Sequence, residues 1–174
     1  MPPRPPAIAG VSSSKEAVIM TVYPSISCLG LGTWLGRLYE SAPTKIFGIK
    51  LSYILYCLIT APGALKAYFY LKLFGETYVV TNRSIQRRKS LGNALVTQVP
   101  LASIATVTVR QTDGQQFYKA ADLLLLNKAG ETVMVLAGVP RADVFRQTIV
   151  EAIDAHNQVA ASLATIRART PVTA

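Results

Sequence analysis

Histidine and cysteine are scarce in this 174-residue sequence, which contains one histidine, His156, and two cysteines, Cys28 and Cys57. A structural zinc site needs about four such ligands, and a serine or cysteine nucleophile needs a histidine beside it. Neither set can be assembled here, and the acidic residues are scattered along the chain rather than paired. The sequence therefore predicts a non-enzymatic protein with no catalytic residue, metal site or cofactor.

Acidic residues are also few, because nine aspartates and glutamates stand against 18 lysines and arginines, a formal net charge of +9 at pH 7. A chain with this balance is attracted to anionic partners such as phospholipid headgroups or nucleic acid. The length limits the chain to one ordinary domain, or one small domain with a short appendage. Since 51% of the residues are apolar, part of that apolar surface needs a core or a membrane to cover it.

Residues 1–16 are expected to form a flexible leader, because the first 14 residues contain four prolines and three serines and no packable apolar face. Residues 17–36 carry no charge. This stretch is about as long as a helix needs to cross a bilayer. Residues 25–39 are a candidate for membrane insertion, and an interfacial or re-entrant helix is the alternative. Val18, Ile19 and Val22 leave a third possibility open, a short β-like segment that ends at Tyr23.

Two glycines in this region, Gly32 and Gly36, are four residues apart in apolar surroundings. This spacing lets two helices approach closely, so it predicts helix packing within a membrane.

Residues 51–65 give the stronger membrane signal, because they are uncharged and the apolar character resumes after Lys66. A snorkelling lysine would extend this span to membrane length, and Pro62 would kink the helix. We therefore expect residues 17–73 to contain hydrophobic membrane-associated segments, for which a transmembrane hairpin is one arrangement. A buried helical hairpin in a soluble protein is the alternative.

After residue 73 the pattern changes to short runs of β-forming residues between turn residues. Six strands are expected, at residues 76–82, 84–91, 94–99, 105–111, 122–127 and 132–136. From Pro140 onward, apolar residues recur every three or four positions, which predicts one long amphipathic helix. A run of antiparallel strands followed by a single helix indicates a small, partly open barrel with one end plugged.

Three phrases in this region carry a family resemblance: ETYVVTNRSI at residues 76–85, VPLASI at 99–104 and GVPRADVF at 138–145. With the hydrophobic segment before them, they resemble the small membrane-anchored bacterial pleckstrin-homology (PH) proteins over residues 75–157. The resemblance implies a seven-stranded, two-sheet, partly open barrel with a C-terminal helix. It places the PH-like domain at residues 74–157, followed by a helical extension and tail at 158–174. The seventh strand is expected near residues 116–119, or within one of the six runs.

Four basic residues, Arg83, Arg87, Arg88 and Lys89, lie within seven positions around the first hairpin of this domain. The resemblance implies that Arg83, Arg87 and Lys89 lie where eukaryotic PH domains contribute cations to inositol-phosphate binding. These four residues are candidate contacts for a phosphate or an anionic lipid. A solvated charged strand, or a positive-inside signal that orients the chain, is the alternative.

The leading hypothesis is a membrane-anchored PH-like binding or scaffold module, which presents the barrel surface to protein or anionic lipid at the cytoplasmic face of a bacterial inner membrane. The alternatives are a specific phospholipid headgroup sensor and a soluble basic barrel that binds nucleic acid. Few aromatic residues fall on the expected strands, which argues against nucleic acid as the partner. The helical extension is a candidate for self-association or for docking an unknown protein partner.

Overall fold

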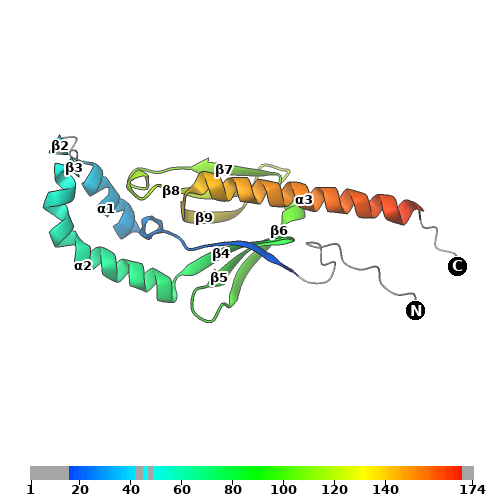
Figure 1. The fold of residues 1–174 in the computed structure, drawn as a ribbon, viewed down its shortest axis with the longest axis horizontal. Coiled ribbons are helices and arrows are strands. Elements are labelled where there is room, and N and C mark those ends of the chain that lie inside the picture. Colours follow the sequence, from blue (N-terminus) through cyan, green and yellow to red (C-terminus); the bar gives the residue numbers. More distant parts are fainter. Residues whose placement is uncertain (1–15, 42–44, 47–48, 170–174) are drawn as a thin grey trace.

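The computed structural model describes residues 16–41, 45–46 and 49–169. Two antiparallel sheets, three α-helices and a short hairpin account for most of this part of the chain (Figure 1). Sheet 1 has the order β1-β4-β5-β6, and its strands are β1 (Val18–Val22), β4 (Glu76–Thr81), β5 (Ser84–Lys89) and β6 (Leu95–Pro100). Sheet 2 has the order β7-β8-β9, with β7 (Thr106–Arg110), β8 (Ala120–Leu126) and β9 (Thr132–Pro140).

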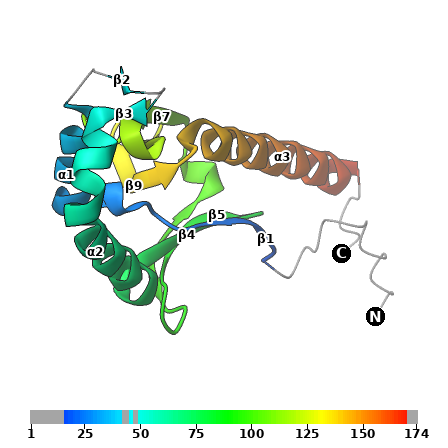
Figure 2. The same ribbon diagram turned by 60° about the vertical axis from the view of Figure 1, so that its left-hand side comes forward.

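The helices lie at opposite ends of the molecule. Helices α1 (Gly30–Glu40) and α2 (Leu51–Phe74) pack against each other at one end, while α3 (Ala142–Arg169) crosses the sheets and continues past them at the other (Figures 1 and 2). The hairpin of β2 (Lys45–Ile46) and β3 (Ile49–Lys50) lies between α1 and α2 in the chain. Three short 3-10 helices complete the fold: η1 (Ile26–Cys28), η2 (Leu101–Ser103) and η3 (Gln116–Tyr118).

The expected mainly-β architecture with a C-terminal helix is confirmed, and the two sheets do not close into a barrel. All six strands expected from the sequence are present. Turns between these strands contain Gly92, Gly114 and Gly130, each of which adopts a positive φ that residues with a side chain reach only with strain. Local turn chemistry thus fixed most of the strand boundaries.

The seventh strand is β1, and the expectation of a strand near residues 116–119 was wrong, because this segment forms the 3-10 helix η3. Strand β1 pairs antiparallel with β4, with Met20 opposite Val80 and Val22 opposite Tyr78. Val22 is buried with Tyr78 and Val80 in the core. The third sequence alternative, a short β-like segment, therefore describes residues 18–22 correctly. The segment that holds α1 and α2 connects two neighbouring strands of one sheet.

The core lies between the two sheets and is completed by the first turns of α3. Phe145 and Ile149 are both 0% exposed, and the helix contacts β7, β8 and η2. Further along α3, beyond the sheets, Leu163 is 44% exposed. Self-association through this extension remains a prediction.

Among the described residues, no helix combines the length and the apolar character needed to cross a membrane. Residues 25–39, one of the expected inserted segments, are divided between η1 and the eleven-residue helix α1. In α2, Pro62 and Gly63 interrupt the apolar sequence and lower its mean hydropathy, although the helix continues through them. The fold therefore does not support the expected transmembrane helix.

One side chain links the two sheets where they diverge. The Tyr78 hydroxyl on β4 donates to the carbonyl oxygen of Ala137 on β9 and accepts from its N–H, both at 3.1 Å. A register shift leaves Ala137 without a partner in the β8–β9 pairing. Burial raises the pKa of Tyr78 to about 12, so the hydroxyl stays protonated at physiological pH and can keep both bonds.

Replacing Tyr78 with phenylalanine is expected to lower the free energy of unfolding by roughly 1–2 kcal/mol, because two backbone groups of Ala137 lose their partner. Urea denaturation followed by circular dichroism measures this change. Tyr23→Phe is the matched control, because Tyr23 is 55% exposed and its hydroxyl contributes little to the fold. Equal stability of the two variants would show that the Tyr78 hydroxyl does not hold the sheets together.

Candidate functional site

Helix α1 packs closely against η1 and the β7–β8 loop at two of its glycines. A Cβ atom at Gly36 would lie 2.0 Å from the carbonyl oxygen of Gly114, in the loop between β7 and β8. A Cβ atom at Gly32 would lie 1.8 Å from the carbonyl oxygen of Ile26 in η1. The spacing of Gly32 and Gly36 therefore serves close backbone packing, and the partners within the described residues are η1 and the β7–β8 loop.

An aromatic cluster holds α1, α2 and η3 together. The rings of Tyr39 and Phe117 stack at 4.8 Å, and Tyr53 on α2 meets both of them edge-on. The Ser52 hydroxyl also donates to the Tyr39 carbonyl oxygen at 2.6 Å. Burial raises the pKa of the adjacent Tyr118 to about 12. This cluster makes the helical pair a fixed part of the domain.

Asp122 on β8 accepts hydrogen bonds from the backbone of β9 and from a side chain of the β7–β8 loop. Its Oδ1 accepts from the N–H of Gly138 at 2.8 Å and from the side-chain amide of Gln115 at 2.7 Å, and its Oδ2 lies 3.8 Å from Arg110. The carbonyl oxygen of Gly138 in turn accepts from the N–H of Ser25, just before η1, at 2.8 Å. One buried carboxylate thus links β9, which contacts η1, to the β7–β8 loop, against which α1 packs.

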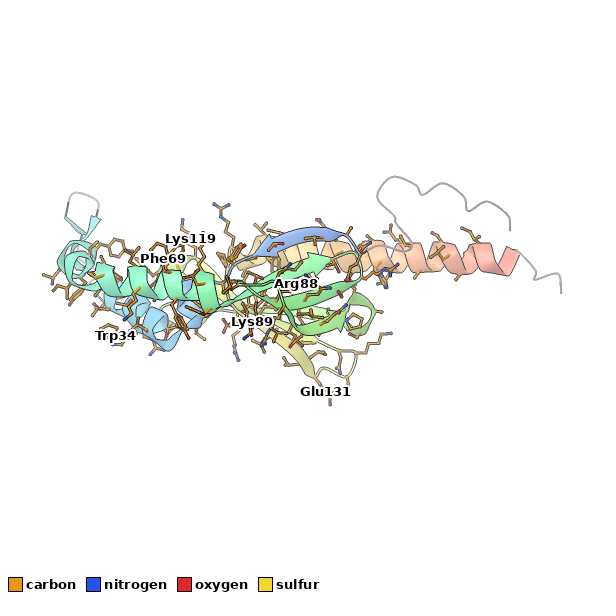
Figure 3. All side chains as sticks on the ribbon, turned by 90° about the horizontal axis from the view of Figure 1, so that it is seen from below. Trp34, Phe69, Arg88, Lys89, Lys119 and Glu131 are labelled. Atoms are coloured by element: carbon orange, nitrogen blue, oxygen red, sulfur yellow. The ribbon has the colours of Figure 1, made fainter. Side chains whose placement is uncertain are left out.

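The outer side of the helical pair is apolar and exposed. Large side chains of α2 that are about half or more exposed run along its length: Leu55, Ile59, Leu65, Tyr68, Phe69, Tyr70, Leu73 and Phe74. On α1, Trp34 is 56% exposed. Figure 3 shows Trp34 and Phe69 over this helical end of the molecule. We call this surface the α2 face. Eight large exposed apolar side chains on one helix are more than the single, scattered ones that are normal on soluble proteins.

The four basic residues expected to act together are divided by the structure. Arg83 is exposed at the β4–β5 turn, whereas Arg87, Arg88 and Lys89 lie at the other end of β5, about 15 Å away for a strand of this length. The Arg87 guanidinium forms a two-point ion pair with Glu76, with Nε 2.8 Å from Oε2 and Nη2 3.4 Å from Oε1. Glu76 thus offsets the charge of Arg87.

Arg88 and Lys89 line a hollow of about 300 Å³ on sheet 1. Strict alternation along β5 would send these two side chains to opposite faces. A register shift in the β5–β6 pairing at residues 87–88, together with the turn that follows Lys89, brings both to the same hollow. In Figure 3 both lie over the strands that follow α2. The hollow is also lined by four polar residues, Thr21, Thr77, Ser90 and Asn93.

A polar network next to the hollow fixes the Arg88 side chain. Its Nε donates to Gln86 Oε1 at 2.7 Å, and Gln86 Nε2 donates to Glu16 at 2.9 Å. The same Glu16 oxygen also accepts from the hydroxyls of Ser84 and Thr81. These hydrogen bonds lower the pKa of Glu16, and the bond from Ser84 has the largest effect. The Glu16 carboxylate is therefore ionised at neutral pH.

Among the described residues, no group of three His, Cys, Asp or Glu side chains is placed to hold a metal ion. Two surface features of the described residues stand out, the apolar α2 face and the basic hollow on sheet 1. The two open antiparallel sheets followed by a C-terminal helix are consistent with a PH-like fold.

Comparison with protein families identifies the same class. Residues 29–153 match the bacterial PH domain family, and the chain belongs to this family. The match begins just before α1, so it includes the helical pair as well as the strands from β4 onward. Comparison with curated proteins gives no significant match.

Sequence reasoning identified Arg88 and Lys89 but missed the rest of the hollow. Ser90 and Asn93 follow Lys89 directly, yet Thr21 and Thr77 come from two strands far apart in the chain. It also missed the aromatic cluster. The tyrosines at 39 and 53 and the adjacent aromatics at 117 and 118 were visible in the sequence, but nothing local indicated that they meet.

Proposed function

We propose that this protein is a non-enzymatic binding module that lies on the surface of an anionic membrane, with the α2 face in the lipid interface. The observation that carries this proposal is the continuous exposure of large apolar side chains along α2. Ile59, at its middle, is 76% exposed, and Phe74, at its end, is 65% exposed. A helix that is apolar on all sides needs cover on all sides, and among the described residues α1, η1 and η3 pack on one side of α2 while large apolar side chains elsewhere on it are exposed.

Charge favours a lipid surface as that cover. The helical pair and its connection, residues 30–74, contain five lysines and arginines, at 37, 45, 50, 66 and 72, and one acidic residue, Glu40. Lys66 and Lys72 are exposed on α2 itself, and long lysine side chains can reach headgroup phosphates while their methylene groups remain among apolar neighbours. Each cation near an anionic leaflet contributes about 1 kcal/mol.

This arrangement would place the two sheets beside the bilayer with α3 directed away from the helical pair (Figure 1). In this proposal the membrane is the bacterial plasma membrane and the PH-like domain lies on its cytoplasmic side. The domain surface outside the α2 face is then available to a protein partner.

Vesicle flotation of the full chain tests the proposal. We expect the protein to float with phosphatidylcholine vesicles that contain 30 mol% phosphatidylglycerol, and less with phosphatidylcholine alone. Phe69→Asp with Leu73→Asp is expected to weaken the partition at least about tenfold, because two large apolar side chains are replaced by charged ones.

The matched control is Val144→Asp with Leu163→Asp, which makes the same change in charge at exposed apolar positions of α3. This variant should partition within about threefold of the wild type, since Coulomb screening limits the effect of distant charges. Equal losses in both variants, or a wild type that stays with the unbound fraction, would rule out the α2 face as the membrane contact.

A further inference from the structure

Helix α3 continues well past the sheets on which it packs (Figures 1 and 2). The last buried side chain that the structure describes on it is Ala152, and none of the side chains between residues 154 and 166 is buried. We call residues 154–169 the projecting segment, which is roughly 24 Å long at 1.5 Å per residue. We propose that this segment pairs antiparallel with the projecting segment of a second copy of the chain.

One side of α3 carries residues at the spacing of a coiled coil. These positions, which we call the α3 seam, alternate at intervals of three and four residues: Ile149, Ala152, His156, Val159, Leu163 and Ile166. The sheets cover the first two, which are 0% and 6% exposed, whereas Leu163 and Ile166 are 44% and 58% exposed. The same seam is therefore covered at its start and uncovered along the projecting segment.

The width of the α3 seam favours another helix as its cover. Val159, Leu163 and Ile166 are the only large apolar residues between positions 154 and 166. A stripe this narrow matches the a and d positions of a coiled coil, whereas a helix that lies in a membrane interface needs a broad apolar face. His156 is the one polar residue of the seam, and a single polar residue at such a position helps to specify the register of paired helices.

Two observations favour a second copy in the antiparallel orientation. The start of the α3 seam faces the sheets of its own chain, so in a parallel pair the sheets of both copies would compete for the same side of the helices. The charges also agree, because Asp154 lies at the start of the projecting segment and Arg167 and Arg169 lie at its end. Antiparallel order brings these unlike charges together, whereas parallel order brings like charges together.

The length of the projecting segment fits this orientation. When Val159 packs opposite Leu163 of the second copy, the two-fold axis passes level with Ala161. Position 153, where the contact of α3 with the core ends, then lies opposite position 169, where the helix of the second copy ends. Each projecting segment therefore covers the uncovered seam of the other, in the self-complementary contact of a two-fold dimer.

This inference does not rest on the proposed membrane contact. The α2 face lies at the other end of the molecule from the projecting segment, so the dimer leaves the α2 face of each copy exposed (Figure 1). Two heptads bury less surface than a standard interface, so we expect weak association, with a dimer at about 100 µM and a monomer at about 1 µM. Vesicle flotation at about 1 µM therefore measures the membrane contact of the monomer.

Sedimentation velocity of the full chain without lipid tests the pairing. Leu163→Asn with Ile166→Asn is expected to weaken association about tenfold or more, because four apolar side chains of the dimer become polar. The matched control is Ala161→Asn with Ala164→Asn, which lowers helix propensity at exposed positions on the other side of the same turns. This control should associate within about threefold of the wild type.

A third variant separates the α3 seam from the α2 face. Phe69→Asp with Leu73→Asp should form the dimer as the wild type does, because the α2 face takes no part in it. Loss of the dimer in this variant, or an equal loss in the control pair and the seam pair, would overturn the proposal. A wild type that sediments as a monomer at about 100 µM would overturn the second copy as the partner of the seam.

The orientation is tested by the distance between spin labels attached at Gln147, in a Cys28→Ser, Cys57→Ser background. Gln147 is exposed near the start of α3, far from the two-fold axis of the proposed dimer. Antiparallel pairing places the two labels about 40 Å apart along the helix axis, whereas parallel pairing places them within about 25 Å. A distance near 40 Å is the expected result, and the shorter distance would overturn the antiparallel dimer.

Discussion

Replacing Phe145 with alanine is expected to lower the free energy of unfolding by about 3–5 kcal/mol, the range for a fully buried phenylalanine. Phe145 is 0% exposed in the first turns of α3, where the helix meets η2, β7 and β8. Its ring fills the open end between two sheets that are not closed into a barrel. Removal leaves a cavity that the strands cannot collapse to fill, because their pairing fixes their positions.

Thermal unfolding measures this loss, and for a chain of this size it corresponds to a decrease of about 10 °C in Tm. Val144→Ala is the matched control, because the neighbouring Val144 is 56% exposed on the same turn of the helix. Its Tm should stay close to that of the wild type. A Phe145→Ala variant whose Tm falls no further than that of Val144→Ala would show that burial of the Phe145 ring does not stabilise the contact of α3 with the sheets.

Replacing Gly36 with valine is expected to destabilise the protein by about 3 kcal/mol and to separate α1 from the β7–β8 loop. A Cβ atom there would lie 2.0 Å from the Gly114 carbonyl oxygen, and backbone atoms cannot rotate away as a flexible side chain would. Gly114 itself has a φ of 85°, and a Cβ atom on it would lie 2.2 Å from the Thr33 carbonyl oxygen, so neither side of the contact can yield.

Gly63→Val provides the control, because nothing lies within 4 Å of a Cβ atom at Gly63 in the interior of α2. Helix propensity favours valine over glycine slightly at both positions, so propensity alone predicts a small gain in each. Urea denaturation gives the stabilities, and hydrogen exchange of the α1 amides reports release of the helix. A Gly36→Val variant as stable as Gly63→Val would contradict the close packing of α1 on the β7–β8 loop.

Much of the fold could be predicted because its signals are local. The strand β8 was visible as the run DLLLL, and the turn before β6 as Gly92 and Asn93, whose φ angles of 78° and 53° few other residue types adopt readily. The helix α3 was visible from the spacing of Phe145, Ile149 and the apolar residues after them. These features depend on neighbours within a few positions, so the sequence alone indicates them.

The candidate site was less predictable. Arg88 and Lys89 were singled out by charge, but nothing in the sequence indicated that Glu76 forms an ion pair with Arg87 or that Arg83 lies at the far end of β5. Such pairings follow from the register of β4 against β5. The four cations are therefore not one cluster: Arg87 pairs with Glu76, Arg83 lies at the β4–β5 turn, and Arg88 and Lys89 line the hollow.

The sequence by itself determined the balance of charge, the excess of apolar residues, six of the strands and the terminal helix, because each follows from composition or from local periodicity. Only the tertiary structure decided that β1 joins β4, that Gly36 meets Gly114, and that one side of α2 is covered while the other is exposed. These are contacts between segments far apart in the chain. Residue pattern shows that an apolar surface exists, but only three-dimensional packing determines which part of it remains for a partner.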